Sequence, residues 1–208
     1  YHDHSPAFSA DGKFVVFLSD RTFDPSYDTH EFALAFLGST RPWLIPIAAR
    51  EPAPFGPTAE GWRISPQPAP TEPPEEPPAS PDLDVEGAEE RIVPFPVPSG
   101  DYRQLRAAAG GMLWIKQSRE TGELGSRRAG VTDEPAGDSL QFWSWSQRRC
   151  TTVADKVDSY AVSCDGTRVV IRHGDAITVQ AADTKPSPED PTAVVTVDLS
   201  RLRFEVEP

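Results

Sequence analysis

Ser26, Asp28 and His30 bring the three side-chain types of a serine hydrolase within five positions of one another. Such chemistry needs a serine within hydrogen-bond reach of a histidine that an acid orients. The chain has no Gly-x-Ser-x-Gly nucleophile turn. The three residues also follow Pro25 in a connection where Ser and Asp ordinarily stabilise turns. We therefore predict no catalytic residue in this chain.

His2 and His4 flank Asp3 at the start of the chain, and in a strand the two imidazoles would share one face. Histidine nitrogens are metal ligands, but a zinc site takes three or four protein ligands. No further cluster of ligating residues stands nearby in the sequence. We predict an ordinary strand start without a metal, and no cofactor.

Asp82, Asp84 and Glu86 have the D-x-D-x-E spacing at which a calcium-binding EF-hand loop begins. The rest of that loop is missing, because Gly87 follows directly and Val93 stands where the bidentate acid belongs. These carboxylates are better explained as part of a solvated acidic loop.

The five tryptophans have the flat rings that stack on sugars and bases, but such rings also fill the space between packed sheets. Trp143 and Trp145 alternate along one expected strand, so both point to the same face. We predict packing roles for Trp43, Trp114 and this pair. Trp62 is assigned no role.

The charge balance excludes two classes of partner. The 208 residues carry a formal net charge of −12, which is repelled by nucleic acids and by anionic membranes. No stretch approaches the ~20 apolar residues of a membrane span, and the first residues lack a signal-peptide pattern. Cys150 and Cys164 are too few for a disulfide framework, which fits a reducing, cytoplasmic setting.

Prolines gather in one part of the chain. Fourteen of the 23 lie between residues 51 and 98, with TEPPEEPPASP (71–81) at the centre. Proline removes the donors that a sheet needs, and this run has few apolar residues for a core. We predict an extended, acidic insertion over residues 49–90.

The rest of the chain predicts short strands, and one pattern occurs twice. Residues 5–21 (SPAFSADGKFVVFLSDR) and 159–172 (SYAVSCDGTRVVIR) share Ser-x-Asp-Gly between two β-prone runs. The Asp-Gly pair suits a hairpin turn. Further strands are expected at 32–37 and 43–48 after the first copy and at 176–181 after the second.

A third, degenerate unit lies between the two copies, with strands expected at 103–108, 112–117, 140–146 and 149–153. Repeated units of four short strands are typical of β-propeller blades, whereas an immunoglobulin-like sandwich does not repeat a hairpin in register. We predict an all-β, partial β-propeller of about three four-stranded blades. The divisions are blade strands at 1–48, the insertion at 49–90, a degenerate blade at 91–157, and a third blade with an exit strand at 158–208.

The first hairpin resembles the repeat of TolB-type propellers, and the segment after it resembles a particular family. Residues 19–48 are similar to the propeller of tricorn proteases, as are 90–105, 110–116 and the closing strand 197–208. The residues that carry the resemblance in the first segment are Phe23, Asp24, Pro25, Tyr27, Asp28, His30, Phe32, Arg41, Pro42, Trp43 and Leu44.

The resemblance implies the last blades of the second, seven-bladed propeller of a cytoplasmic serine endopeptidase that degrades oligopeptides. It implies a homo-oligomer whose chain also carries peptidase and PDZ-like regions, with the catalytic residues beyond Pro208. On this interpretation the segment is not catalytic and guides or filters peptides toward the active site. The alternative is a TolB-like propeller that serves as a protein-interaction scaffold without peptidase activity.

A peptide channel would need polar or charged side chains on the innermost strand of each blade. The expected carriers are Ser5 and Ser159 together with the basic residues Lys13, Arg103 and Arg168. A locally basic lining attracts peptide carboxylates even in an acidic protein. We predict that these cations line the channel.

Overall fold

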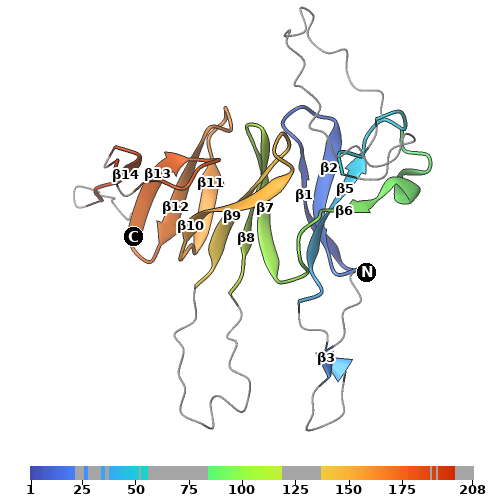
Figure 1. Ribbon diagram of the computed structural model, residues 1–208, viewed down its shortest axis with the longest axis horizontal. Helices are drawn as coiled ribbons and strands as arrows, with labels where there is room; N and C mark the ends of the chain where they lie inside the picture. The colour runs from blue at the N-terminus through green and yellow to red at the C-terminus, as the bar shows by residue number, and fades with distance from the viewer. Residues whose placement is uncertain are drawn as a thin grey trace, which may run out of the picture.

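The computed structural model of the chain contains three antiparallel sheets of four strands each and one separate pair of short strands (Figure 1). The structure describes residues 1–21, 38–51, 53–55, 84–118, 137–187, 189–190 and 192–199, and the backbone of 26–27 and 34–35. One 3-10 turn, η1 (Ala88–Arg91), and no α-helix occur among these residues. The predicted all-β class is confirmed.

The first sheet has the order β1 (Asp3–Phe8), β2 (Phe14–Ser19), β5 (Arg41–Pro46) and β6 (Val93–Pro94). β-Branched and aromatic residues form β2, which pairs antiparallel with β1 and β5. The stretch 32–37, expected as a further strand, is described as strand only at β4 (Leu34–Ala35). β4 pairs with β3 (Ser26–Tyr27) outside the four-stranded sheet.

The second and third sheets are built from strands in chain order. The second contains β7 (Tyr102–Ala108), β8 (Gly111–Lys116), β9 (Ser139–Ser144) and β10 (Arg149–Asp155). The third contains β11 (Ser159–Val162), β12 (Arg168–His173), β13 (Ala176–Ala181) and β14 (Val194–Thr196).

The first sheet takes its last strand from beyond residue 90, because β6 lies at 93–94 and pairs with β5. The sheet therefore extends into the range that the sequence analysis gave to the second blade. The main-chain N–H of Asp84 donates to the carbonyl of Ile47 (3.1 Å) and ties the end of the insertion to the first sheet. Residues 56–83, with Trp62, lie outside the described residues, and the domain boundaries stay a prediction.

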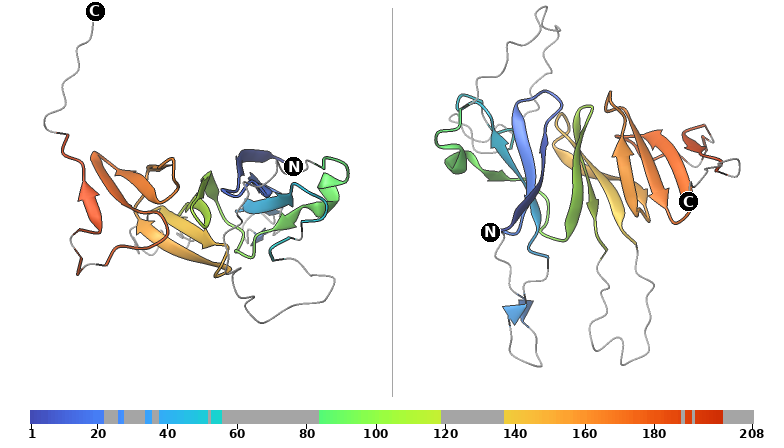
Figure 2. Two further views of the ribbon diagram at one scale, coloured as in Figure 1. Left: turned by 90° about the horizontal axis from the view of Figure 1, so that it is seen from above. Right: turned by 180° about the vertical axis from the view of Figure 1, so that it is seen from behind.

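The three sheets stand side by side like the blades of a fan, and they do not close into a ring (Figures 1 and 2). The first strands of neighbouring sheets are in contact, β1 with β7 and β7 with β11. We call β1, β7 and β11 the inner strands. Each is an edge strand of its sheet.

Two hydrophobic cores fill the spaces between the sheets. The first lies between sheets one and two, the second between sheets two and three. β8 contributes to both, with Met112 and Trp114 in the first core and Leu113 and Ile115 in the second. The middle sheet is therefore buried on both faces, whereas each outer sheet has one neighbour among the described residues.

The predicted packing is confirmed for Trp114, Trp143 and Trp145. Trp114 and Trp143 are buried in the first core, and Trp145 packs against it. Phe95 meets Trp114 and Trp143 edge to face, with ring centroids 5.5 Å apart in each pair. Trp43 lies on the other face of the first sheet, where the Arg21 guanidinium stands 5.5 Å from its ring centroid.

Both predicted Ser-x-Asp-Gly hairpins are present and are held by the same hydrogen bonds. In the third sheet the Ser163 hydroxyl donates to Asp165 Oδ1 (2.5 Å) and accepts the main-chain N–H of Arg168 (3.0 Å). Ser9 and Asp11 repeat this arrangement in the first sheet. Only the glycine of each pair has a positive φ, 70° at Gly12 and 72° at Gly166.

Val16 and Val170 occupy equivalent positions, each four residues after the turn glycine of its hairpin. Replacing each by alanine therefore compares the same substitution in two sheets. Val16 is 0% exposed and Val170 is 41% exposed. Removing buried methyl groups costs their transfer free energy and leaves a cavity. We expect the free energy of unfolding to fall by about 2 kcal/mol for Val16→Ala and by less than about 1 kcal/mol for Val170→Ala. Denaturant titration of the 208-residue chain measures both, and equal losses would contradict the assignment of the cores.

Asp165 provides a test at acid pH. Hydrogen bonds from the Ser163 hydroxyl, and from the N–H and hydroxyl of Thr167, lower the pKa of its carboxyl from 3.8 to about 2. The carboxylate therefore stabilises the folded chain fully above pH 3.8, and this contribution disappears as pH falls through about 2. We expect Asp165→Asn to lower the melting temperature at pH 7 and to have no effect below pH 2. A difference that is independent of pH would contradict this assignment.

Candidate functional site on the inner strands

Two inner strands carry the same irregularity. The register of β1 with β2 shifts between His4 and Ala7, and that of β7 with β8 shifts between Arg103 and Arg106. Each bulge contains a residue other than glycine with a positive φ angle. This angle is 55° at Ser5 in β1 and 54° at Gln104 in β7. Bulges redirect side chains and are frequent beside functional sites. In β1 and β7, two of the three inner strands, the bulge therefore changes which face the following side chains occupy.

Tyr160 joins the third sheet to the second at the inner strands. Its hydroxyl lies 2.9 Å from the carbonyl oxygen of Leu113 and also contacts that of Gln104. A phenol has one proton to donate, so the two carbonyls share it. Burial raises the pKa of Tyr160 well above the ordinary value of 10, which keeps the donor protonated.

Arg103 lies on an inner strand as predicted, but its guanidinium is engaged. It donates to Asp138 Oδ2 (2.8 Å) and to the carbonyl of Asp158 (2.9 Å). The other oxygen of Asp138 accepts the main-chain N–H of Ser118 (3.1 Å). Arg103 thus ties β7 to the connection between β10 and β11.

The other two predicted cations do not lie on inner strands. Lys13 is in the turn between β1 and β2 and pairs with Glu51 (3.2 Å). Arg168 is the first residue of β12, the second strand of its sheet. The structure shows no contact among Lys13, Arg103 and Arg168, and their channel-lining role stays a prediction. Ser5 and Ser159 do lie on inner strands.

Arg106 is a candidate that the sequence analysis missed. Arg106 is exposed on β7, and its guanidinium donates to the carbonyl of Leu105 (3.0 Å). No ion pair of Arg106 occurs within the described part of the chain. In a regular strand, residues 103 and 106 would point to opposite faces. The bulge at Gln104 places both on one face, because they pair with Ile115 and Leu113.

The histidine pair lies within the described residues, whereas the triad-like side chains do not. The rings of His2 and His4 are 5.1 Å apart, and His2 Nδ1 is 3.8 Å from Asp20. No group of three metal-ligating side chains occurs among the residues that the structure describes. The side chains of Ser26, Asp28 and His30 lie outside the described residues, as do Asp82 and residues 22–25.

Cys150 and Cys164 are not bonded to each other. In the described ranges, no helix is long and apolar enough to cross a membrane.

Radially arranged four-stranded sheets whose first strands meet at the centre define a β-propeller, here an incomplete one. The family model described as the tricorn protease second beta propeller domain matches residues 1–183. The chain belongs to this family.

Relatives agree with this assignment. "Tricorn protease homolog 1" of Streptomyces coelicolor is 42% identical over 209 residues, which cover this whole chain and 20% of the relative. "Putative tricorn protease homolog 2" of the same organism is 33% identical over 210 residues, which cover this whole chain and 18% of that relative. The chain therefore spans about a fifth of the length of the curated relatives that it matches.

Solved structures support the fold. A crystal structure of the tricorn protease aligns with a TM-score of 0.65 and 24% identity, covering 97% of this chain and 17% of that one. A crystal structure of TolB from Acinetobacter baumannii aligns with a TM-score of 0.37, which is too low to support a shared fold.

Tyr160→Phe tests the link between the second and third sheets. We expect a loss of about 1–3 kcal/mol in the free energy of unfolding, because two partly buried carbonyls lose their donor. Tyr1→Phe is the matched control, since Tyr1 is 94% exposed and should change stability by less than about 0.5 kcal/mol. Equal effects in denaturant titrations would show that the hydroxyl of Tyr160 links nothing.

Proposed function

We propose that this chain is the non-catalytic propeller part of a larger serine peptidase of the tricorn type, and that its inner strands guide or filter peptide substrates. Membership of the tricorn second-propeller family supports the first part. The greater length of the relatives, all bearing tricorn protease names, supports the presence of a peptidase region in the same polypeptide. In this proposal the catalytic serine and its partners lie outside residues 1–208.

The proposed mechanism is steric and electrostatic. A ring of blades leaves a central passage that admits an extended peptide and excludes a folded protein. In the closed ring of this proposal the inner strands border the passage, and the contacts of β7 with β1 and β11 support that placement. Their free edges also carry main-chain groups that an extended peptide can pair with.

Arg106 is the cation that best fits attraction of a peptide. Arg103 has its guanidinium bound to an acid and a carbonyl, whereas Arg106 is exposed on the same face of the same inner strand. An unneutralised guanidinium at a narrow passage attracts the carboxylates of peptides and raises their local concentration. The net charge of −12 repels the same carboxylates elsewhere on the surface.

The other expectations from the resemblance form part of the same proposal. They are a cytoplasmic location, assembly into a homo-oligomer, and contact between the propeller and peptidase and PDZ-like regions of its own chain. No cofactor takes part in the proposed function.

Arg106→Glu in the natural polypeptide that carries this chain tests the proposal. We expect the wild-type polypeptide to hydrolyse a fluorogenic oligopeptide. For the peptide with a free C-terminal carboxylate, the substitution should lower kcat/KM by about two- to fivefold, and for the same peptide with a C-terminal amide the change should be smaller. Arg149→Glu is the matched control, because Arg149 is exposed on the last strand of the second sheet.

Two results would count against the proposal. A wild-type polypeptide that hydrolyses no peptide would favour the scaffold interpretation. Equal losses for the carboxylate and the amide, or for both variants, would remove Arg106 from the path of the substrate.

A further inference from the structure

The face of the third sheet that points away from the second sheet is exposed in the structure. Val170 on β12 is 41% exposed and Val195 on β14 is 54% exposed. They belong to one row across the sheet, in which Ala161, Val170, Val179 and Val195 are successive partners. We call the face that bears this row the free face.

The free face differs in chemistry from the face that occupies its place in the first sheet. There, Phe14, Val16 and Leu18 of β2 are buried in the first core against the second sheet. Val16 pairs with Ala7 as Val170 pairs with Ala161, which establishes the correspondence.

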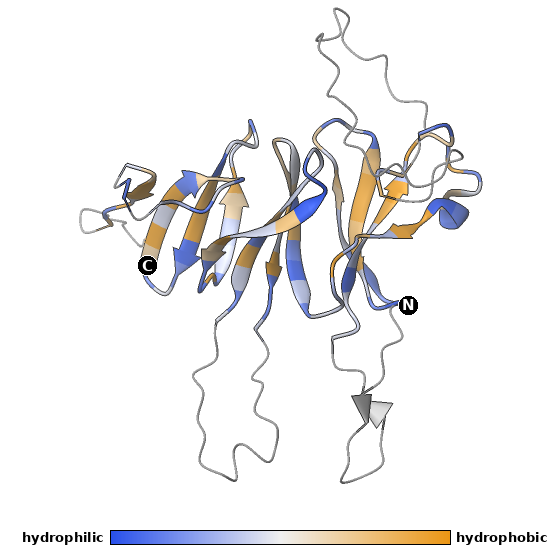
Figure 3. Ribbon diagram, viewed as in Figure 1, coloured by the Kyte–Doolittle hydropathy of each residue, from blue (hydrophilic) through white to orange (hydrophobic). Residues whose placement is uncertain are grey.

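The matching residues of β12 are Arg168, Val170 and Arg172, so two arginines replace two apolar side chains. β2 is hydrophobic over nearly its whole length, whereas β12 begins and ends with hydrophilic residues (Figure 3). A covering sheet would therefore meet two cations beside one valine.

Neither arginine is neutralised within the described part of the chain. Arg172 donates from Nε to the carbonyl of Gly174 (3.1 Å), and the side chain of Arg168 has no hydrogen bond or ion pair there. Burying a guanidinium without an acid is strongly unfavourable, because the charge loses its hydration without gaining a counterion. An apolar cover, of the kind that the first sheet receives, would leave both charges unpaired.

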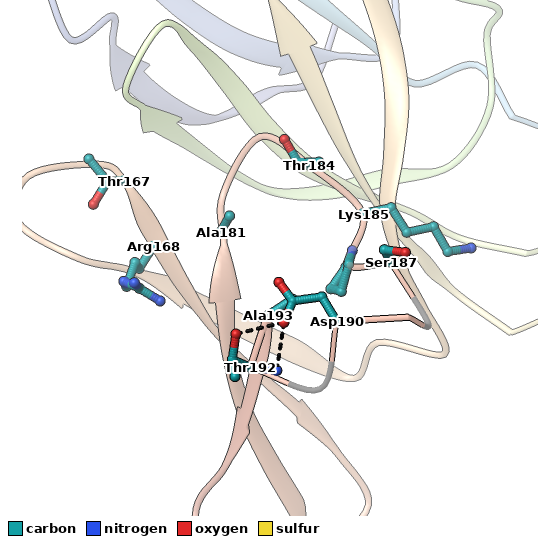
Figure 4. A pocket seen from close by; sticks show the side chains of 10 residues that line it. Thr167, Arg168, Ala181, Thr184, Lys185, Ser187, Asp190, Thr192 and Ala193 are labelled. Carbon is teal, nitrogen blue, oxygen red and sulfur yellow. Dashed lines mark hydrogen bonds between the residues drawn. The ribbon is translucent and has the colours of Figure 1, made fainter.

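A recess of about 510 Å³ lies beside Arg168 on this part of the sheet (Figure 4). Thr167, Thr184 and Thr192 are among the residues that line it. Lys185 also lines the recess but pairs with Asp155 (2.6 Å). The recess is wide enough for an acidic side chain and offers it the guanidinium of Arg168. The hydroxyls of the three threonines already donate to aspartates of this chain, namely Asp165, Asp183 and Asp190.

One acid already stands in the recess. Asp190 accepts the main-chain N–H (2.9 Å) and the hydroxyl (2.6 Å) of Thr192 through one oxygen, Oδ1. These hydrogen bonds lower the pKa of its carboxyl. Asp190 is thus turned toward Thr192, and no ion pair between Asp190 and Arg168 is present.

We propose that the free face receives the acidic sheet face of another blade of the same polypeptide, and that the recess holds one of its carboxylates. In sheets one and two, the corresponding face is covered by the next sheet along the chain. By the same packing, the free face of the third sheet is the place for a further blade. This contact closes the propeller through ion pairs around the row of Val170, where the other two contacts use apolar cores. This contact rests on the proposed membership of a larger polypeptide but not on the passage of peptides.

Coverage is tested by thiol labelling in the natural full-length polypeptide. The test variant is Val170→Cys, and the control is Asp175→Cys in the turn between β12 and β13, which stays accessible to solvent. Both are made in a Cys164→Ser background, because Cys164 is exposed and would also react. We expect the cysteine at 170 to react with maleimide at least about tenfold more slowly than that at 175. Equal rates would overturn the proposal, as would protection that disappears on dilution to the monomer, because a second copy would then be the cover.

The ionic nature of the contact is tested separately in the same polypeptide. Arg168→Glu and Arg172→Glu are compared with Arg149→Glu on β10, with the neutral Arg168→Gln as a milder variant in case charge reversal prevents folding. We expect the first two to lower the melting temperature at low salt and to recover part of the loss at high salt. Protection of position 170 without any effect of these substitutions would indicate an apolar cover and overturn the proposal.

Discussion

The structure depends on one constraint, which is that a sheet with two apolar faces must be covered on both. β8 shows it most clearly, because Met112 and Trp114 point into one core while Leu113 and Ile115 point into the other. A four-stranded sheet of this kind buries little surface alone, so its stability comes from its neighbours. The radial arrangement follows from repeating that requirement from one sheet to the next. The inner strands meet because the sheets pack face to face in this way.

Backbone geometry at the turns adds a second link between blades. The N–H of Ala109 donates to the carbonyl of Gly166 (2.9 Å), and a Cβ on Gly166 would lie 2.5 Å from that nitrogen. Gly166 therefore needs both its positive φ and its missing side chain. Gly12 occupies the same turn position in the first sheet, yet a Cβ there would meet nothing within 4 Å. The same turn thus serves hairpin geometry in one sheet and contact between sheets in the other.

The strands were predictable where local pattern and packing agree. β-Branched and aromatic runs around Ser-x-Asp-Gly predicted both hairpins, and the tryptophans of the middle sheet were correctly assigned to packing. The path between β2 and β5 was not predictable, because β4 has the composition of a sheet strand but pairs with β3 instead. The candidate cations were harder still. Arg103 could be placed on an inner strand, but its engagement by Asp138 depends on residues 35 positions away.

The bulge in β7 explains why Arg106 escaped notice and why its position matters. Alternation along a strand assigns residues 103 and 106 to opposite faces, and only the extra residue at Gln104 brings them together. The carbonyl of Gln104 also contacts the hydroxyl of Tyr160, so the same irregularity takes part in joining the second sheet to the third. Straightening β7 would therefore turn the exposed guanidinium away and break a contact between blades in one step. The placement of Arg106 and the contact between the second and third sheets therefore both depend on the conformation of Gln104.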